Sequence, residues 1–313
     1  VFQTLKLHRW NCNVCGLCPK MTVLNYVRLL GDPGVDGPDK HATASSMHPT
    51  GEASKTRVGL VAYHGPMNLS FPQRTRVDAI IQAAMDMEAA PLLHALAPIG
   101  DDETPHAVLA GTHKTQRFAL GILDGKTVLV VTSGIGLANA ASATARALTL
   151  VDAPIVIAAG TTGGLARDIN VGDIAVGTTA IYGQADATAF GYAMGQVPQM
   201  PVDYTSSDAA VARLAELPAL IAHTVREGRV VSSDSFCTEQ VADPMRERFP
   251  DAIGADMETC AMAQVCWSSS VDWISLRAVS DLCGPSADQA FHMDGQRAAG
   301  HSAEAVRAYL SLL

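Results

Sequence analysis

Apolar residues occur in short runs along the chain, and polar residues and turns separate them. The runs at 77–84, 118–123 and 127–132 have the length and character of buried strands. Residues 137–150 are rich in alanine and contain neither glycine nor proline, which predicts a helix. The apolar run at 155–159 follows this helix and predicts a strand that is buried on both faces.

Later segments continue this alternation. Helical spacing marks 88–96, and 107–111 is a further short apolar run. A strand is predicted at 173–182, followed by a long loop at 183–203. The remaining segments alternate between predicted helix and predicted strand: 208–220, 229–232, 239–248, 253–255, 258–267, 273–279 and 289–313. The pattern predicts an α/β fold with three α/β/α layers around a central mixed sheet.

Residues 1–66 differ from the rest of the chain. They include the turn-rich stretch 31–38 and the Ser-, Thr- and Ala-rich stretch 41–54, without a sustained apolar period. We therefore expect a weakly ordered leader at 1–66 and a folded domain at 67–313. A chain that begins at Met67 is expected to keep its fold and activity.

Composition and charge narrow the range of partners. With 48% hydrophobic and 17% charged residues, the chain can form a substantial core. The net charge of −9 is uneven, because residues 1–66 hold 7 basic and 4 acidic side chains and the rest hold 15 and 27. An acidic body without a basic stripe cannot neutralise a polyanion, so we expect small-molecule partners and no nucleic acid.

The seven cysteines are an odd number without the regular spacing of a disulfide framework. The apolar runs are much shorter than the roughly 20 residues that span a bilayer, and the first residues lack a signal-peptide pattern. We therefore expect a cytoplasmic protein without a membrane partner. Cys12, Cys15 and Cys18 have the spacing of part of a metal or iron–sulfur site, but only His8 is near enough in sequence to complete it. We expect no metal.

Four segments with polar or glycine residues follow predicted strands: 85–88, 133–136, 160–164 and 280–281. Ligands of α/β sheets bind at the carboxyl ends of strands, so we expect these segments to meet at one site. The glycines of 133–136 would let backbone N–H groups approach an anion at a helix start, although a tight strand-to-helix turn is the alternative.

Several side chains have both a structural and a functional interpretation. Glu88 and Glu258 at helix starts either interact with the helix dipole or act in the site. Met257 either packs in the core or contacts a ligand. Arg277 and Asp281, at the end of an apolar strand, form either a buried ion pair or part of the chemistry.

Seven motifs, in this order, carry a resemblance to a known family. They are AMDMEAAPLL, SGIG, GTTGGLARDINVGDIAVG, YGQADATAFGYAMGQVP, VSSDSFC, ADMETCAMAQVC and LRAVSD. On these motifs, residues 77–313 resemble the 5′-methylthioadenosine/S-adenosylhomocysteine nucleosidases of the nucleoside phosphorylase superfamily. The resemblance implies a nucleoside phosphorylase-like fold and a nucleosidase catalytic domain at 67–313. The implied reaction, a step of methionine salvage, hydrolyses the N-glycosidic bond of both nucleosides and releases adenine and the 5-thio-substituted ribose.

The resemblance implies a division of catalytic work. Asp281, supported by Ser280, would be the general acid that protonates adenine N7. Glu88 would orient and deprotonate the attacking water, with Ser133 and Arg277 near that water. Cleavage of this bond builds positive charge on the ribose and negative charge on the purine, which explains the need for an acid and a carboxylate.

The resemblance also implies the residues that hold the substrate. Glu258 would bind the ribose hydroxyls, with Met257 under the sugar and Met85 on the ribose side. Phe236 would stack on adenine, while the backbone of Cys237 would read its Watson–Crick edge.

The loop at 183–203 is implied to form the pocket for the 5′-alkylthio group. Phe190, Tyr192 and Met194 would line it, and Pro198 would come from a neighbouring subunit. Such an apolar stretch otherwise packs locally or covers a ligand or partner. The implied partners are adenosine thioethers, water and a second copy in a homodimer with shared active sites, and the implied chemistry uses no cofactor.

The sequence departs from the family pattern at several positions. Thr161 and Thr162 stand where smaller residues are usual, Cys237 replaces an aliphatic residue, and Met194 replaces an aromatic one. The last two changes concern substrate preference more than the type of reaction.

Three alternatives remain open. A purine nucleoside phosphorylase would need cationic groups and a glycine-rich loop for phosphate, yet the Gly-Asp-Pro at 31–33 lies in the leader and lacks a following arginine. An aminodeoxyfutalosine nucleosidase would differ in the 5′ pocket. A non-catalytic nucleoside sensor would have lost the acid or the base, whereas Asp281 and Glu88 are both present.

Overall fold

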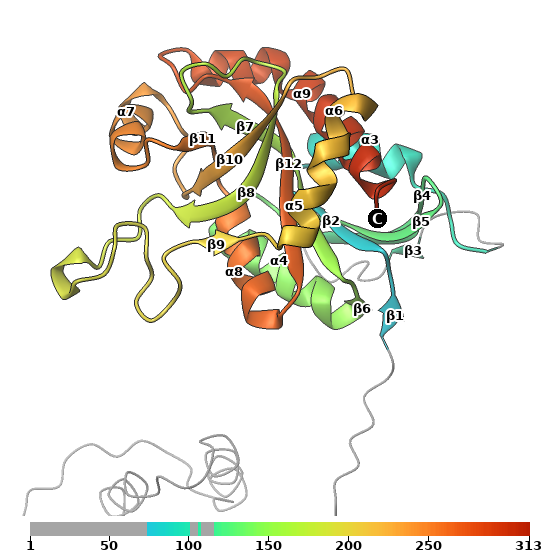
Figure 1. Cartoon of the computed structure of the whole chain (residues 1–313). Helices are drawn as coiled ribbons and strands as arrows, with labels where there is room; N and C mark the ends of the chain where they lie inside the picture. Colours follow the sequence, from blue (N-terminus) through green and yellow to red (C-terminus); the bar gives the residue numbers. More distant parts are fainter. Residues whose placement is uncertain (1–73, 101–105, 108–115) are drawn as a thin grey trace, which may run out of the picture. The chain divides into compact units, whose positions relative to one another are not determined.

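The computed structural model describes residues 74–100, 106–107 and 116–313 (Figure 1). The predicted leader at 1–66, with Cys12, Cys15 and Cys18, lies outside the described residues. The apolar run predicted at 107–111 is described only at its first residue, which ends a two-residue strand.

The described residues form a ten-stranded mixed sheet with the order β11-β10-β8-β12-β7-β2-β5-β4-β3, and β9 pairs with β8. Its strands are β2 (Ala79–Ala83), β3 (His106–Ala107), β4 (Arg117–Leu123), β5 (Lys126–Thr132), β7 (Ile155–Gly164), β8 (Ile174–Tyr182), β9 (Tyr204–Thr205), β10 (Val225–Ser232), β11 (Ala252–Asp256) and β12 (Asp272–Asp281). Strands β12, β7, β2 and β5 are parallel neighbours, whereas β8 is antiparallel to β12. A separate parallel pair joins β1 (Thr75–Arg76) to β6 (Val151–Asp152).

Helices connect most of these strands. They are α3 (Asp86–Ala95), α4 (Leu137–Leu150), α5 (Asp208–Ala212), α6 (Leu217–Leu220), α7 (Glu239–Arg248), α8 (Thr259–Ser269) and α9 (Ala287–Leu310), with 3-10 turns η1 (Thr188–Phe190) and η2 (Arg213–Glu216). None of the helices in the described ranges is long and apolar enough to cross a membrane.

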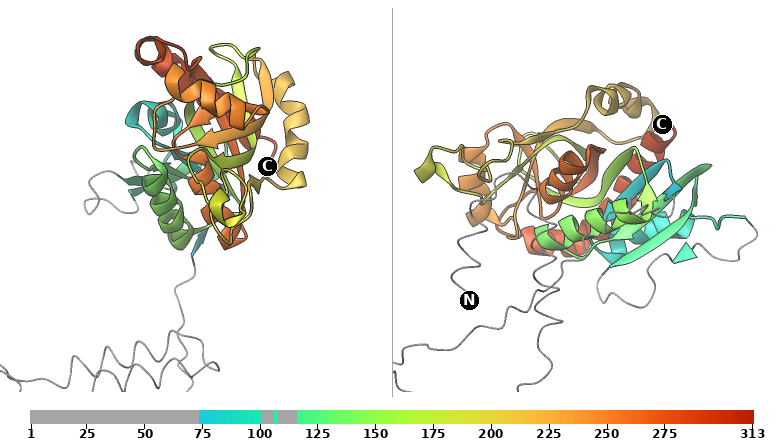
Figure 2. Two further views of the ribbon diagram at one scale, coloured as in Figure 1. Left: turned by 90° about the vertical axis from the view of Figure 1, so that its left-hand side faces the viewer. Right: turned by 90° about the horizontal axis from the view of Figure 1, so that it is seen from below.

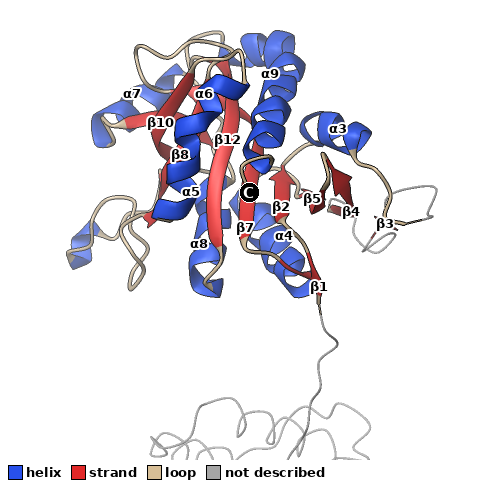
Figure 3. Cartoon of the chain, turned by 45° about the vertical axis from the view of Figure 1, so that its right-hand side comes forward, coloured by secondary structure: helices blue, strands red, loops and turns tan. Residues whose placement is uncertain are grey.

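Helices cover both faces of the sheet, as the sequence predicts (Figures 2 and 3). Side chains alternate between the faces with the period of a strand. In β2, Ile81 packs in the core under α3 and α9, whereas Ile80 packs in the core under α4 and α8. In β5, Val130 packs in the same core as Ile81, and Leu129 packs in the same core as Ile80. The three-layer α/β/α prediction is therefore confirmed.

The strand predicted at 155–159 is longer than expected, because the segment 160–164, expected to follow it, is part of the strand. Strand β7 continues to Gly164, where Gly163 and Gly164 pair antiparallel with Ala255 and Gly254 of β11. A Cβ on Gly164 would lie 2.7 Å from Ile169 Cγ2, so a side chain at this end of β7 would collide with the segment that follows the strand. The overlap involves the last residues of both strands, which brings their carboxyl ends to the same region.

The helix predicted at 208–220 is divided into α5, η2 and α6. Pro218, at the start of α6, has no N–H to donate, which weakens a continuous helix at this point. Leu214 and Leu217 still pack in the same core as α9. The segment is therefore helical as predicted, but in three pieces instead of one continuous helix.

Candidate active site

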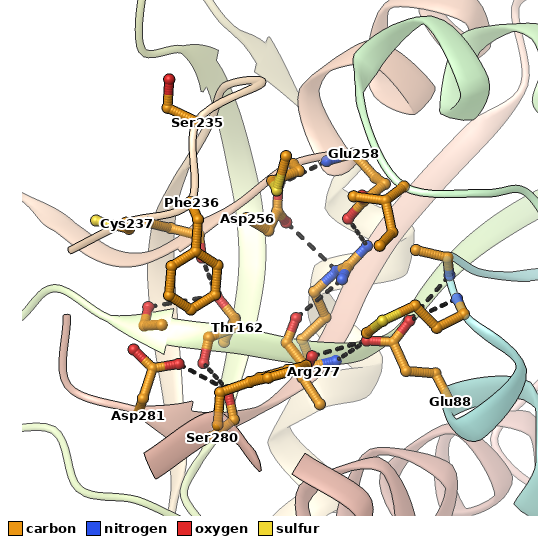
Figure 4. Close-up of a pocket in the computed structure, with 18 residues that line it drawn as sticks. Glu88, Thr162, Ser235, Phe236, Cys237, Asp256, Glu258, Arg277, Ser280 and Asp281 are labelled. Carbon is orange, nitrogen blue, oxygen red and sulfur yellow. Dashed lines mark hydrogen bonds and ion pairs between the residues drawn. The ribbon is translucent and has the colours of Figure 1, made fainter. Parts of the chain in front are cut away.

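A pocket of about 150 Å³ lies where several strands end (Figure 4). One water accounts for about 30 Å³ of liquid volume, so the pocket accommodates a small organic group. Nine of the predicted site residues line it: Met85, Glu88, Phe236, Cys237, Met257, Glu258, Arg277, Ser280 and Asp281. The other lining residues are Ala84, Ile135, Thr161, Thr162, Gly163, Ser235, Ala255, Asp256 and Phe291.

Asp281 is the last residue of β12 and is buried at one end of the pocket. Its Oδ2 accepts a hydrogen bond from the Ser280 hydroxyl at 2.9 Å, and its Oδ1 accepts one from the Cys283 N–H at 3.0 Å. Burial raises the pKa of Asp281 above its usual range, although both hydrogen bonds act in the opposite direction. This carboxyl group holds a proton at higher pH than an exposed aspartate does.

Glu88 lies in the first turn of α3, and Figure 4 shows it on the opposite side of the pocket from Asp281. Its Oε2 accepts hydrogen bonds from the N–H groups of Ala84 and Met85 at 3.0 and 3.1 Å. Its Oε1 accepts the N–H and the hydroxyl of Thr161 at 2.8 and 2.7 Å. The bond from the Met85 N–H belongs to a capping box, so Glu88 has the structural role at a helix start as well as a place in the pocket.

Arg277 belongs to β12. Its side chain is buried and interacts with two carboxylates. One terminal nitrogen lies 3.1 Å from Glu258 Oε2, and Nε lies 3.3 Å from Asp256 Oδ2. The other terminal nitrogen donates to the Thr161 carbonyl at 2.9 Å. Burial opposes the charge, but Asp256 and Glu258 raise the pKa of Arg277 above its ordinary value, so the side chain is a cation. Arg277 therefore forms buried ion pairs, as one of the two interpretations expected. Its partners are Asp256 and Glu258 and not Asp281.

Asp256 fixes the connection between β11 and α8. Its Oδ1 accepts the Ser232 hydroxyl at 2.5 Å and the N–H groups of Glu258 and Thr259 at 3.2 and 3.1 Å. Its Oδ2 accepts the Thr259 hydroxyl. A buried carboxylate with this many donors holds the following residue, Met257, and Glu258 in a fixed position.

Glu258 is buried between the start of α4 and Arg277. Its Oε1 accepts the Gly136 N–H at 2.9 Å. Burial raises the pKa of Glu258 to about 7, Arg277 acts against this shift, and the charges of Asp256 and Glu88 add to it. Near neutral pH, Glu258 therefore exists in both protonation states.

The glycine turn at 133–136 presents the start of α4 to two carboxylates. Gly136 N–H donates to Glu258, and Leu137 N–H donates to Asp234 Oδ1 at 2.8 Å. Gly136 has a φ of +102°, a conformation that favours glycine. The anions at this helix start are thus the protein's own carboxylates.

Apolar side chains line the space between the polar ends of the pocket. The rings of Phe236 and Phe291 meet edge to face, with centroids 6.0 Å apart and planes at 73°. Met85, Ile135 and Met257 add further apolar surface. An apolar wall with a few fixed polar groups is typical of a site for a small, partly aromatic ligand.

Five predicted site residues lie outside this lining. The Ser133 hydroxyl donates to the carbonyls of Ala83 and Gly134 at 3.2 and 2.8 Å, within the turn that leads to α4. The other four belong to the loop at 183–203: Phe190, Tyr192, Met194 and Pro198.

The loop residues were expected to complete a pocket together with a second subunit, and that role stays a prediction. Phe190 is 83% exposed, more than any other large hydrophobic side chain among the described residues. Met194 packs beside the buried cluster that contains Ile181 and Met245.

Sequence reasoning missed three lining residues that matter to the geometry. Asp256 was visible as a carboxylate two positions before Glu258, but its contact with Arg277 depends on the pairing of distant strands. Thr161 was noted only as larger than usual, and its bonds to Glu88 follow from the extension of β7. Phe291 had no local signal, because only the approach of α9 brings it to Phe236. Among the described residues, no group of three His, Cys, Asp or Glu side chains is placed to hold a metal ion.

The fold and the site define a class: a three-layer α/β protein with a small-molecule pocket between buried carboxylates at the ends of its strands. The model of the phosphorylase superfamily matches residues 78–311, which is most of the chain. The chain belongs to this superfamily.

Within this superfamily, the relatives and solved structures described next are mostly nucleosidases of one kind. A 5′-methylthioadenosine/S-adenosylhomocysteine nucleosidase of Staphylococcus aureus (strain MRSA252) is 34% identical over 234 residues, which cover 74% of this chain and 99% of the relative. The Neisseria meningitidis nucleosidase of the same name, in complex with methylthio-immucillin-A, is 32% identical with a TM-score of 0.70 and coverage of 75% and 99%. The corresponding enzyme of Colwellia psychrerythraea 34H, in complex with adenine, is 30% identical with a TM-score of 0.69 and coverage of 77% and 98%. A futalosine hydrolase of Helicobacter pylori, at 22% identity, shares the fold.

Proposed function

We propose that the chain is an N-glycosidic hydrolase that cleaves 5′-methylthioadenosine and S-adenosylhomocysteine into adenine and the 5-thio-substituted ribose. The match to relatives and solved structures of this name extends over nearly the whole length of those proteins. One observation carries the proposal. A single pocket holds a buried aspartic acid of raised pKa, Asp281, and on its other side the carboxylates of Glu88 and Glu258 with Arg277.

Asp281 is the proposed general acid. Loss of the purine leaves negative charge on the base, so protonation of adenine N7 makes the base a better leaving group. Burial favours the protonated form of Asp281, while Ser280 and the Cys283 N–H stabilise the carboxylate that remains after transfer. The site therefore accommodates Asp281 both before and after it gives up its proton. Ser280 is the proposed positioning residue for this carboxyl group.

Glu88 is the proposed base for the attacking water. The ribose gains oxocarbenium character as the glycosidic bond breaks, and carboxylates on that side stabilise positive charge. Glu258, oriented by Gly136 and Arg277, is the proposed acceptor for the ribose hydroxyls. The predicted contact of Ser133 with the water stays part of this proposal.

Apolar residues supply the proposed contacts to the base and the sugar. Phe236 offers a ring that can stack on adenine, and the neighbouring Cys237 brings its backbone to the same wall. Met257 and Met85 line the pocket near the carboxylates, which supports the sugar contacts proposed for them. No cofactor takes part in the proposed reaction.

Water suits this pocket better than phosphate as the nucleophile. Within the described lining, Arg277 is the one cationic side chain, and it is bound to Asp256, Glu258 and the Thr161 carbonyl. The first N–H groups of α4, which suit an anion, are occupied by Glu258 and Asp234. A phosphate dianion would also approach Glu88 and be repelled.

The loop at 183–203 supports a proposed homodimer with shared active sites. Phe190 and its neighbours present an apolar surface that a second subunit would cover. In that assembly Phe190, Tyr192 and Met194 complete the 5′-alkylthio pocket, and Pro198 comes from the second copy.

The domain division at residues 66 and 67 is also a proposal. The family match begins at residue 78, and the Staphylococcus relative is covered almost completely by 74% of this chain. A chain that begins at Met67 should therefore show the kcat/KM of the full chain.

The experiment that tests the function measures adenine release from methylthioadenosine, adenosylhomocysteine and aminodeoxyfutalosine. We expect the first two to be preferred. Asp281→Asn and Glu88→Gln should each lose at least about 10²-fold in kcat, the lower range for a positioned acid or base. Asp251→Asn is the matched control, because Asp251 pairs with Arg229 at the surface. Normal kcat in either catalytic variant would remove the role assigned to that residue.

A further inference from the structure

A buried serine of α9 joins two strands of the sheet next to residues of the site. Ser302 is fully buried, in a helix that packs against β7 and β12. Its hydroxyl oxygen accepts the Gly160 N–H at 2.8 Å, and the hydroxyl donates to the Leu276 carbonyl at 2.6 Å. Ser302 does not line the pocket, so the scheme above gives it no role.

The two backbone groups that this hydroxyl holds each precede a residue of the site. Gly160 is followed by Thr161, whose N–H and hydroxyl donate to Glu88 Oε1. Leu276 is followed by Arg277, which donates to the Thr161 carbonyl. Both ends of the bridge therefore lead to Thr161, the residue that holds one oxygen of Glu88.

The bridge occurs where the backbone of β7 is unusual. Gly160 has a φ of +122° and lies opposite Arg277 in the register of β7 and β12. The carboxylate of Glu88 occupies the space in which a Cβ of Gly160 would lie. A residue without a side chain cannot be held by side-chain packing, so its position depends on backbone hydrogen bonds. Ser302 supplies one of these bonds from outside the sheet.

We propose that Ser302 is a positioning residue for the reaction, and that its hydroxyl fixes β7 so that Thr161 orients Glu88. Buried backbone groups without a partner are costly, so loss of the hydroxyl makes the strand shift until the Gly160 N–H finds another acceptor. A displacement of about 1 Å in a catalytic group can lower a rate by about 10²-fold. The effect on the rate rests on the function proposed above, whereas the effect on the position of Thr161 does not.

Kinetics of the full chain test the effect on the reaction. In Ser302→Ala we expect kcat for methylthioadenosine to fall at least about tenfold while KM changes less than about threefold, because Ser302 lies outside the pocket lining. Ser302→Thr keeps the hydroxyl and should stay within about threefold of the wild-type kcat. Ser302→Cys fills the space with a weak donor, so it should lose kcat as Ser302→Ala does, and it replaces that variant if the alanine variant does not fold.

Three kinetic results would overturn the proposal. The first is a kcat within about threefold of the wild type when the hydroxyl is absent. The second is a rise in KM without a fall in kcat. The third is an equal loss of kcat in Ser302→Thr and Ser302→Ala, which would show that the hydroxyl is not what matters.

Tyr309→Phe is the matched control for lost stability. Tyr309 is on the same helix, is fully buried, and its hydroxyl also donates to a backbone carbonyl, that of Ala210, at 2.9 Å. Ala210 does not line the pocket. We expect Tyr309→Phe and Ser302→Ala both to lower the melting temperature, and only Ser302→Ala to lower kcat. An equal loss of kcat in both variants would show an effect of stability alone and overturn the proposal.

Crystal structures of the wild type and Ser302→Ala measure the position of Thr161 without an activity assay. The Thr161 hydroxyl lies 2.7 Å from Glu88 Oε1. We expect this distance to exceed the hydrogen-bond range, about 3.5 Å, in the variant. An unchanged distance would overturn the proposal, whether or not the protein is a nucleosidase. A wild type that releases no adenine, together with the expected change in distance, would remove the proposed function and still support the positioning of Thr161 by Ser302.

Discussion

The four hydrogen bonds to Glu88 differ in how easily each can be exchanged. A carboxylate has about four acceptor positions, and three of those on Glu88 hold backbone N–H groups that the fold keeps in place. The fourth holds the Thr161 hydroxyl, which can rotate. In the proposed reaction, we expect the water that gives its proton to Glu88 to take the position of this hydroxyl, and Thr161 to keep Glu88 oriented before the water binds.

Substitution of Thr161 tests this view of Glu88. Thr161→Val keeps the shape but removes a hydrogen bond to a charged group, which is typically worth about 1.5 to 3 kcal/mol. We expect kcat/KM to fall at least about tenfold, while Thr161→Ser, which keeps the hydroxyl, stays within about threefold of the wild type. Equal activity of the valine and serine variants would show that the hydroxyl has no part in catalysis.

Glu258 should make the stability of the fold depend on pH. Its pKa is raised to about 7 in the folded state, mainly by burial, so the folded chain binds more protons than the unfolded chain between about pH 4.5 and 7. This contribution is complete below about pH 4.5 and is lost as the pH rises through about 7. Asp281, whose pKa is also raised, acts in the same direction.

Thermal unfolding from about pH 5 to about pH 8 measures this effect. We expect the free energy of unfolding to fall by about 2 kcal/mol over this range, and by less in Glu258→Gln. A stability that rises with pH, or an unchanged slope in the variant, would contradict the assigned state of Glu258.

The sequence predicted nine of the eighteen residues that line the pocket, and few of their contacts. Asp281, Glu88 and Arg277 were recognised because each belongs to a local motif. The partners of Arg277 were not, since Asp256 and Glu258 reach it only through the pairing of β7 with β11 and β12.

At the scale of elements, the end of β7 determines the position of Glu88, the proposed base. Gly160 has a φ of +122°, and a Cβ there would lie 2.5 Å from the carboxylate carbon of Glu88. The strand and the start of α3 approach each other because this position has no side chain. The sequence analysis ended this strand at residue 159, because the glycines at 163 and 164 do not reveal a strand partner about 90 residues away.

Gly160→Ala tests the need for this approach. The new methyl group must displace Glu88, and we expect a loss of about 2 kcal/mol in stability and about 10²-fold in kcat. Gly125→Ala is the matched control, because Gly125 also has a positive φ of +81° but has open space around it. This variant should lose only about 1 kcal/mol of stability, the cost of a positive φ for a residue with a Cβ. Its kcat should not change. Equal effects of the two variants would show that crowding at Glu88 is unimportant.

Strands and helices with a clear period were predicted well. The helix at 137–150 agrees with α4, and 239–248 agrees with α7. The strand predicted at 173–182 agrees with β8 to within one residue. The short strands β1, β6 and β9 were missed, because two residues carry no period and their pairing is decided by distant segments.

At the scale of the whole molecule, we expect the loop at 183–203 to link activity to assembly. If it completes the pocket of a second copy, the active species is a dimer. Sedimentation at assay concentrations should show twice the mass of one chain, and Phe190→Asp should shift the chain to monomer and raise KM at least about tenfold, because a buried charge opposes association. An active monomer would contradict the shared-site proposal.

The central claim is that water, assisted by Glu88, attacks while Asp281 protonates the departing adenine. The most direct measurement compares adenine release from methylthioadenosine in phosphate-free buffer with release in the presence of phosphate, and identifies the sugar product by mass spectrometry. We expect the same rate in both buffers and free methylthioribose as the product. Adenine release that requires phosphate, with methylthioribose 1-phosphate as the product, would contradict the account.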